Sequence, residues 1–225
     1  MRTFFFDAKL CGGTLVLAAC FIFTAFSSCT RSSPTIAYST MSLNYIEGDT
    51  GVTPSLSFFV LADDDDGYED IDELRLYSDY EGLSWVFKAD EWIRHDEAGN
   101  TWIGARNIAM AGGETFPSGQ YRAVLVDKAG ERSERTFGFD VPEIPRFAFP
   151  KLAINEDSYT ITSEYPENYF LCYGQDGAYR RYVRLESKNA ALSSLRLSSD
   201  ILSVALWAHD PERSTSALTK TAAIR

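Results

Sequence analysis

Histidine is the scarcest chemically versatile residue in this sequence, with only His95 and His209 among 225 residues. With so few, metal binding or acid–base chemistry would depend on carboxylates alone. The sequence also lacks the Gly-x-Ser-x-Gly of serine hydrolases, the His-Glu-x-x-His of zinc proteases and a phosphate-binding loop. We therefore expect no enzymatic activity and no catalytic residues.

Basic residues are also few, at 21 Lys and Arg against 32 Asp and Glu, which gives a net charge of −11. Nucleic acids are bound by clusters of Lys and Arg, so we expect no nucleic-acid partner. Anionic lipid headgroups repel an acidic protein, so charge alone would not hold this one at a membrane surface.

Cysteine is almost confined to the first 29 residues, where Cys11, Cys20 and Cys29 occur; Cys172 is the fourth. Cys172 lies in the apolar run 169–173, and free cysteine usually behaves as a small buried apolar residue. A catalytic thiolate would need a basic partner beside it, and nothing in the local sequence supplies one. If Cys29 is modified, no intramolecular disulfide remains.

The amino-terminal segment has the three parts of a secretory signal: basic residues at its start, the apolar run 10–26 and a small-residue exit, Ser27-Ser28-Cys29. The alternative is an uncleaved transmembrane helix, for which 17 residues is the short limit. The serine-cysteine exit favours cleavage. We expect residues 1–28 to be a signal peptide and 29–36 a polar tether.

This segment resembles the signal of bacterial lipoproteins, in which the cysteine after the cleavage site receives the lipid. Leu17-Ala18-Ala19-Cys20 matches the family pattern better residue by residue, but Cys29 coincides with the end of the apolar run. We favour Cys29 as the lipidated residue, with Cys20 as second choice. The resemblance implies a cell-envelope protein, anchored to a membrane by its lipid and facing the periplasm or the surface.

Short apolar runs separated by turn residues follow from Ile36 onward, the pattern of an antiparallel β-sandwich. The clearest part is 117–141, where an alternating strand, an Asp-x-x-Gly turn and a returning strand follow one another. This part resembles the last hairpin of bacterial immunoglobulin-like and PKD-like domains, with Tyr121 in the tyrosine-corner position. The resemblance implies an immunoglobulin-like sandwich over residues 37–143.

Three prolines in VPEIPRFAFP then indicate a stiff connector, and we place a domain boundary near Ile144. The remaining residues, 144–225, again show short strands, of which 201–208 is the most regular. They resemble a fibronectin-type-III module, so the whole chain is predicted to be all-β with two tandem antiparallel β-sandwiches. A helix over 189–198 is an alternative for this part.

An acidic turn, residues 63–73, has eight carboxylates among eleven residues. Calcium prefers carboxylate and carbonyl oxygens, but an EF-hand alignment places Ala62 at the first ligand position. A looser calcium site in a sandwich loop therefore competes with a plain solvated turn. The candidate calcium ligands are Asp64, Asp66, Asp70 and Glu73. No other cofactor is expected.

Two further groups are candidates for interaction. Trp92 lies in a polar loop, where an exposed tryptophan could contact a sugar or a protein, although a core position is the alternative. Arg180, Arg181 and Arg184 form a basic cluster that could dock to an acidic partner or simply face solvent. We favour a non-catalytic, membrane-tethered lipoprotein that contacts another envelope protein. The alternative is a ligand-binding lipoprotein that captures calcium or a glycan.

Overall fold

The computed structural model describes residues 32–141 and 146–224, whose regular secondary structure is almost entirely β-strand, so the predicted all-β class is confirmed. The predicted signal peptide, Cys20 and Cys29 lie outside the described residues, as does the predicted boundary at Ile144. Within the described ranges, no helix has the length and apolar character needed to cross a membrane.

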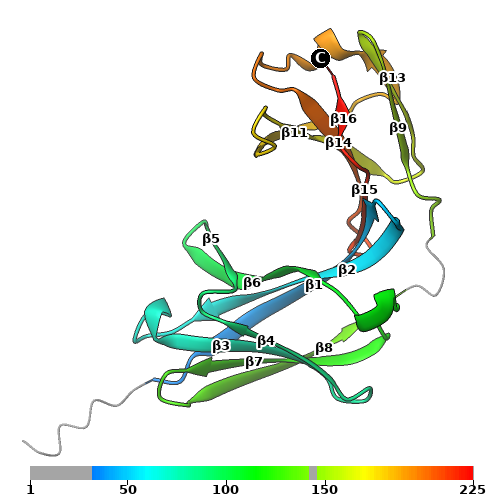
Figure 1. The fold of residues 1–225 in the computed structure, drawn as a ribbon. Coiled ribbons are helices and arrows are strands. Elements are labelled where there is room, and N and C mark those ends of the chain that lie inside the picture. Colours follow the sequence, from blue (N-terminus) through cyan, green and yellow to red (C-terminus); the bar gives the residue numbers. More distant parts are fainter. Residues whose placement is uncertain (1–31, 142–145, 225) are drawn as a thin grey trace, which may run out of the picture. The chain divides into compact units, whose positions relative to one another are not determined.

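Two layers of strands form the first region of the fold (Figure 1). One layer is the four-stranded sheet β4-β3-β7-β8, and the other is the part β1-β2-β6-β5 of a nine-stranded sheet. Between the strands lie the short 3-10 turns η1 (Tyr68–Asp70) and η2 (Ala111–Gly113). The strands are β1 (Thr35–Gly48), β2 (Gly51–Asp63), β3 (Ile71–Ser78), β4 (Leu83–Lys88), β5 (Ile93–Glu97), β6 (Asn100–Ile108), β7 (Gly119–Asp127) and β8 (Arg132–Phe139).

The alternation of apolar residues decides which faces of these strands meet. In β2, the period-two set Leu56, Phe58, Val60 and Ala62 is almost fully buried. These side chains form one core with the inward residues of β3, β6 and β7. The first region is therefore a sandwich with its core between the two layers.

The predicted hairpin of β7 and β8 is confirmed, including its tyrosine corner. The Tyr121 hydroxyl donates a hydrogen bond to the Pro117 carbonyl at 2.7 Å, and the ring is 1% exposed. Gly130 takes a φ of 87° in the turn, a conformation that favours glycine. Gly104 has another role, since a Cβ there would lie 2.1 Å from the Phe58 carbonyl oxygen.

The second region also has two layers. The three-stranded sheet β13-β10-β9 packs against the other end of the nine-stranded sheet, and the two share a smaller core that contains Phe170 and Leu206. The strands are β9 (Lys151–Asn155), β10 (Ser158–Thr162), β11 (Glu167–Tyr173), β12 (Tyr179–Arg184), β13 (Asn189–Ala191), β14 (Ser203–Asp210), β15 (Thr215–Leu218) and β16 (Ala222–Ala223). Residues 189–198, the alternative helix, instead hold β13 and the 3-10 turn η3 (Leu192–Leu195).

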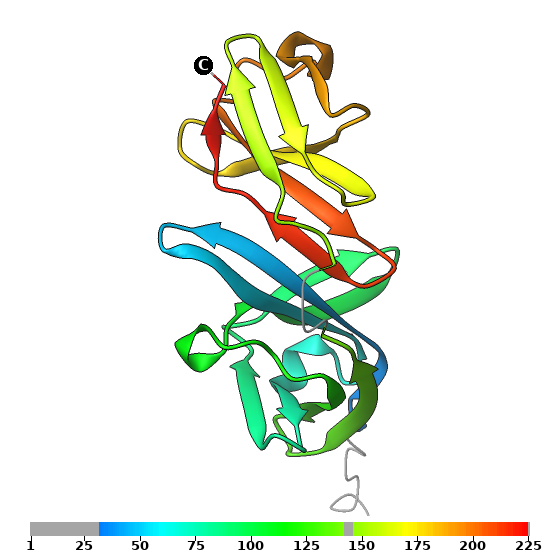
Figure 2. The same ribbon diagram turned by 90° about the vertical axis from the view of Figure 1, so that its right-hand side faces the viewer.

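A parallel pair of strands joins the two regions, which the sequence does not predict. Residues 43–46 of β1 pair with residues 215–218 of β15, and Figure 2 shows the two strands, blue and red, side by side. The Ser216 hydroxyl donates to Asn44 Oδ1 at 2.7 Å across this pair. The nine-stranded sheet therefore runs through both regions without a break, in the order β12-β11-β14-β15-β1-β2-β6-β5, with β16 beside β14. The division into domains at residue 144 stays a prediction.

Candidate functional site

The predicted calcium ligands occupy two different settings. Asp64, directly after β2, is 8% exposed, and its Oδ1 accepts a hydrogen bond from the Asp66 backbone N–H at 3.0 Å. Burial raises the pKa of Asp64, and the neighbouring carboxylates of Asp66, Asp70 and Asp127 raise it further, while the Asp66 bond opposes them. The Asp64 carboxylate is therefore largely shielded from water and lies near other carboxylates.

Glu73 is already neutralised by cations. Its two carboxylate oxygens form ion pairs with Lys88 and Arg75, and these bonds, Lys88 first, hold the pKa of Glu73 below its ordinary value. Within residues 32–141 and 146–224, no group of three or more His, Cys, Asp or Glu side chains is close enough to hold a metal ion. The structure thus does not gather the four candidate ligands into one set.

The other candidate residues are placed as follows. Trp92 is half-buried and packs against the first core. The three arginines diverge. Arg180 donates to both oxygens of Asp176 at 2.8 Å, Arg181 donates to carbonyl groups beside η3, and Arg184 lies 3.6 Å from Glu167. They therefore do not form one basic patch.

Cys172 has the environment of a core residue, as its sequence predicts. It is fully buried in the second core, and burial raises the pKa of its thiol. A raised pKa keeps sulfur in the unreactive thiol form.

The outer face of β11, β12 and β14 carries a row of aromatic rings that sequence reasoning missed. In the part of the chain that the structure describes, none of these rings is among the buried residues that form the cores. The side chains of Tyr182 and Tyr179 are 62% and 51% exposed. Tyr169 has its ring centroid 5.2 Å from that of Trp207 and 5.9 Å from that of Tyr182. We call this set the outer aromatic face: Tyr169, Tyr173, Tyr179, Tyr182 and Trp207.

Charged groups border the outer aromatic face. The Tyr169 hydroxyl donates to Glu167 Oε2 at 2.9 Å, and His209 Nδ1 lies 3.6 Å from the same oxygen. These contacts and Arg184 lower the pKa of Glu167, with the Tyr169 bond the largest cause. The His209 ring stacks on Trp207 at 5.1 Å. The face thus combines apolar rings with hydrogen-bonding groups of both charges.

The composition of β11 explains why the outer aromatic face could not be predicted from the sequence. Tyr169, Phe170, Leu171, Cys172 and Tyr173 form one continuous apolar run, so the run itself does not say which residues face inward. In the structure the second and fourth are buried and the others face outward. In β14, Trp207 alternates with buried neighbours, so the period-two pattern of this strand could have indicated an outward-facing tryptophan.

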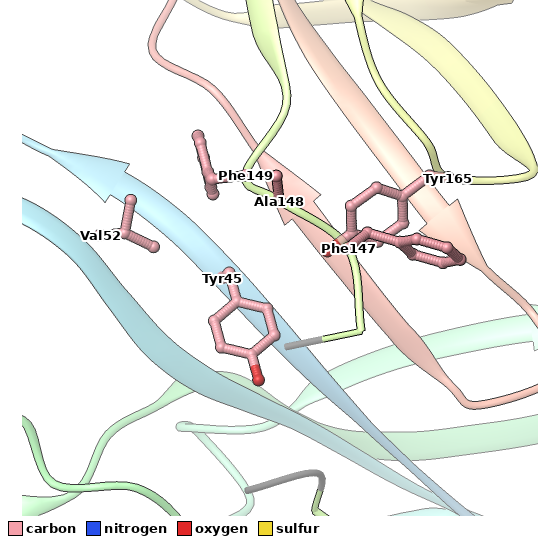
Figure 3. A pocket seen from close by; sticks show the side chains of 6 residues that line it. All are labelled: Tyr45, Val52, Phe147, Ala148, Phe149 and Tyr165. Atoms are coloured by element: carbon pink, nitrogen blue, oxygen red, sulfur yellow. The ribbon is translucent and has the colours of Figure 1, made fainter. Parts of the chain in front are cut away.

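A separate apolar hollow of about 340 Å³ lies beside the junction of the regions (Figure 3). Phe147 packs on Tyr165 with ring centroids 4.9 Å apart. Burial raises the pKa of Tyr165 to about 12, with smaller contributions from Tyr45 and Asp210. The size suits a small apolar group. The lining residues are Tyr45, Val52, Phe147, Ala148, Phe149 and Tyr165.

Comparison with known proteins gives only distant structural similarity. No family model and no curated protein matches the chain. One similar solved structure is Tp47, the 47-kilodalton lipoprotein of Treponema pallidum, at 13% identity and a TM-score of 0.42, covering 84% of this chain and 50% of that one. Another is dimeric latent PorU from Porphyromonas gingivalis, at 15% identity and a TM-score of 0.31, covering 85% of this chain and 20% of that one.

The chain therefore spans half the length of the first of these structures and a fifth of the second. Similarities this low assign neither a family nor a function.

Proposed function

We propose that this protein is a non-catalytic lipoprotein of the bacterial envelope that uses the outer aromatic face to bind another envelope protein. The observation that carries the proposal is the set of aromatic rings left outside both cores. Tyrosine, tryptophan and arginine are the residues most enriched at the energetic centres of protein interfaces. Arg184 fits this composition, since its guanidinium lies 6.0 Å from the centre of the Tyr169 ring.

The setting of the face supports a role in contact. Three of its rings stand on β11 and β14, which are paired on both sides in the nine-stranded sheet and have a buried inner side, and the other two stand on the neighbouring edge strand β12. A rigid sheet holds the rings in place before a partner arrives, which reduces the entropy lost on binding. The carboxylate of Glu167, the guanidinium of Arg184 and the imidazole of His209 would supply a polar rim around an apolar centre.

Site-specific photocrosslinking tests the contact surface. We would place a benzophenone amino acid at position 182 in the living host, with position 80 as a matched control. Tyr80 is also an exposed tyrosine, 94% exposed, but lies in the β3–β4 turn of the first region. We expect one defined adduct from position 182 that Trp207→Ala reduces at least about tenfold, as loss of a hot spot does. Equal labelling from both positions, or none from position 182, would contradict the proposal.

The lipid anchor is a separate part of the proposal and has its own test. The intact mass of the membrane-extracted protein should correspond to a chain that begins at Cys29 and carries acyl chains. Cys29→Ala should abolish this mass, whereas Cys20→Ala, the matched control, should leave the mature mass unchanged. A mature chain that begins at Cys20 would reverse the choice of cysteine, and an unprocessed mass would exclude lipidation.

A glycan ligand is the second candidate, because flat aromatic rings with apolar faces can also stack on sugar rings. Tyr182 offers such a ring, since it is 62% exposed. The glycan would be the ligand if the protein binds purified peptidoglycan fragments, Trp207→Ala abolishes that binding, and position 182 gives no protein adduct.

A further inference from the structure

Two buried carboxylates at one end of the first region lack complete partners. Asp64 directly follows β2 and Asp127 ends β7, and they are 8% and 2% exposed. In each, Oδ1 accepts one backbone N–H, from Asp66 at 3.0 Å and from Glu131 at 2.8 Å. In each, Oδ2 is buried without a hydrogen-bond partner in the part of the chain that the structure describes.

Backbone contacts bring together the two turns that carry these carboxylates. Asp127 pairs with Ile71 in the β3–β7 ladder, and the next residue, Lys128, donates its backbone N–H to the Asp70 carbonyl at 2.8 Å. The turn after β7 is thus held against the acidic turn after β2.

Nearby basic groups do not neutralise the pair. No ion pair joins Asp64 or Asp127 to a Lys or Arg within residues 32–141 and 146–224. The ammonium group of Lys128 donates instead to the Glu69 carbonyl. Burying a carboxylate is costly unless it is paired, hydrogen-bonded or bound to a metal. Two such groups, on turns that contact each other, therefore offer a place for a bound cation.

We propose that a calcium ion binds between the carboxylates of Asp64 and Asp127, with carbonyl oxygens of residues 64–70 and water completing its shell. Calcium accepts six to eight oxygen ligands in flexible geometry, so two carboxylates plus backbone and water are sufficient. Asp127, absent from the candidate ligands of the acidic turn, replaces Glu73, which Arg75 and Lys88 already neutralise. The site is remote in sequence from the outer aromatic face and does not depend on its function.

The test is the thermal midpoint of the full mature protein in detergent, with chelator, with calcium at about 5 mM, or with magnesium at about 5 mM. Extracellular calcium modules have dissociation constants of about 10⁻⁴–10⁻³ M. Tenfold excess over the dissociation constant multiplies the folding constant about elevenfold. For a chain of this size that corresponds to an upward shift of about 3–6 °C. Titration calorimetry should give one site.

The matched variants are Asp64→Asn and Asp127→Asn, with Asp65→Asn as control because Asp65 is exposed in the same turn. Asparagine keeps the oxygen that accepts the backbone N–H but removes the unpaired charge. Both buried variants should lose the calcium shift, with a midpoint in chelator at or above wild type, while the control should keep the shift. No shift in the wild type, or a full shift in either buried variant, would overturn the proposal. If one variant does not fold, the other decides.

Discussion

The two regions of the molecule place most of their paired aromatic rings on opposite sides of their sheets, although Tyr38 and Trp102 also pair on the outside of the first region. In the first region, Phe58 stacks on Phe137 at 6.0 Å and Tyr121 meets Phe139 edge-on at 6.2 Å, all between the layers. In the second, Tyr159 meets Phe170 inside the core with centroids 5.0 Å apart, and Phe147 packs on the buried Tyr165. The outer aromatic face lies on the other side of the same strands.

This difference indicates that the buried rings serve stability and the surface rings are available for recognition. Rings inside a core stabilise the fold because their apolar surface is removed from water. Rings held at the surface leave that free energy available to a partner. The first region is thus organised as a support, and the second as the region that makes contact under the proposed function.

The largest expected effect comes from emptying each core. Phe58→Ala and Phe170→Ala each remove a fully buried ring, which should lower the free energy of unfolding by about 3–5 kcal/mol. Because β1 and β15 join the regions, we expect either variant to shift one common transition in urea. Trp207→Ala is the surface control and should cost clearly less. Two separate transitions, each affected by one variant, would show that the regions unfold independently.

The tyrosine corner should show the next largest effect. Tyr121→Phe keeps the ring but removes the hydrogen bond to the Pro117 carbonyl, so we expect a loss of about 1–2 kcal/mol. Tyr182→Phe is the matched change on the outer aromatic face, where the hydroxyl meets water, and should be near neutral. Urea unfolding measures both. Equal losses would remove the distinction between an inner and an outer tyrosine.

The parallel joint should show a smaller effect. Ser216→Ala removes the hydroxyl that donates to Asn44 Oδ1, which should cost about 0.5–1.5 kcal/mol. Ser203→Ala, also in a strand of the second region, is the control at a half-buried site away from the joint. Hydrogen exchange of residues 43–46 should quicken in Ser216→Ala alone. Unchanged exchange there would mean that the joint does not depend on this bond.

Much of the fold could be predicted because its signals are local. Period-two alternation identified β7 and β14, and the resemblance to immunoglobulin-like hairpins placed Tyr121 at the corner. The β1–β15 pair could not be found in this way, because it joins residues about 172 positions apart through backbone hydrogen bonds that leave no pattern in the side chains.

The sites were harder to predict because they depend on neighbours from other strands. Asp64 was identified from its acidic sequence, but Asp127 read only as a turn residue. Glu73 was included as a ligand because its pairing with Arg75 on its own strand and Lys88 on the next is not evident from sequence. The outer aromatic face needed the register of β11 with β12 and β14, which only the structure gives.

The smallest expected effect is a shared response of both regions to acid. Lys88 and Arg75 lower the pKa of Glu73 in the first region, and Tyr169 and His209 lower that of Glu167 in the second. A lowered folded pKa means that the unfolded chain binds more protons. Each contribution is therefore complete above the ordinary glutamate value of 4.5 and is lost as pH falls through the lower folded pKa.

Urea unfolding between about pH 3 and pH 6 should show this loss, and Glu73→Gln and Glu167→Gln should each make the acid limb shallower. Glu73 is the less exposed of the two, 13% against 27% for its side chain, so its variant should have the larger effect. Solvent screens the Glu167 pair more strongly. A larger effect of Glu167→Gln than of Glu73→Gln would mean that the carboxylate of Glu167 is the better protected of the two. The outer aromatic face would then be less open to water than the exposure of its side chains indicates.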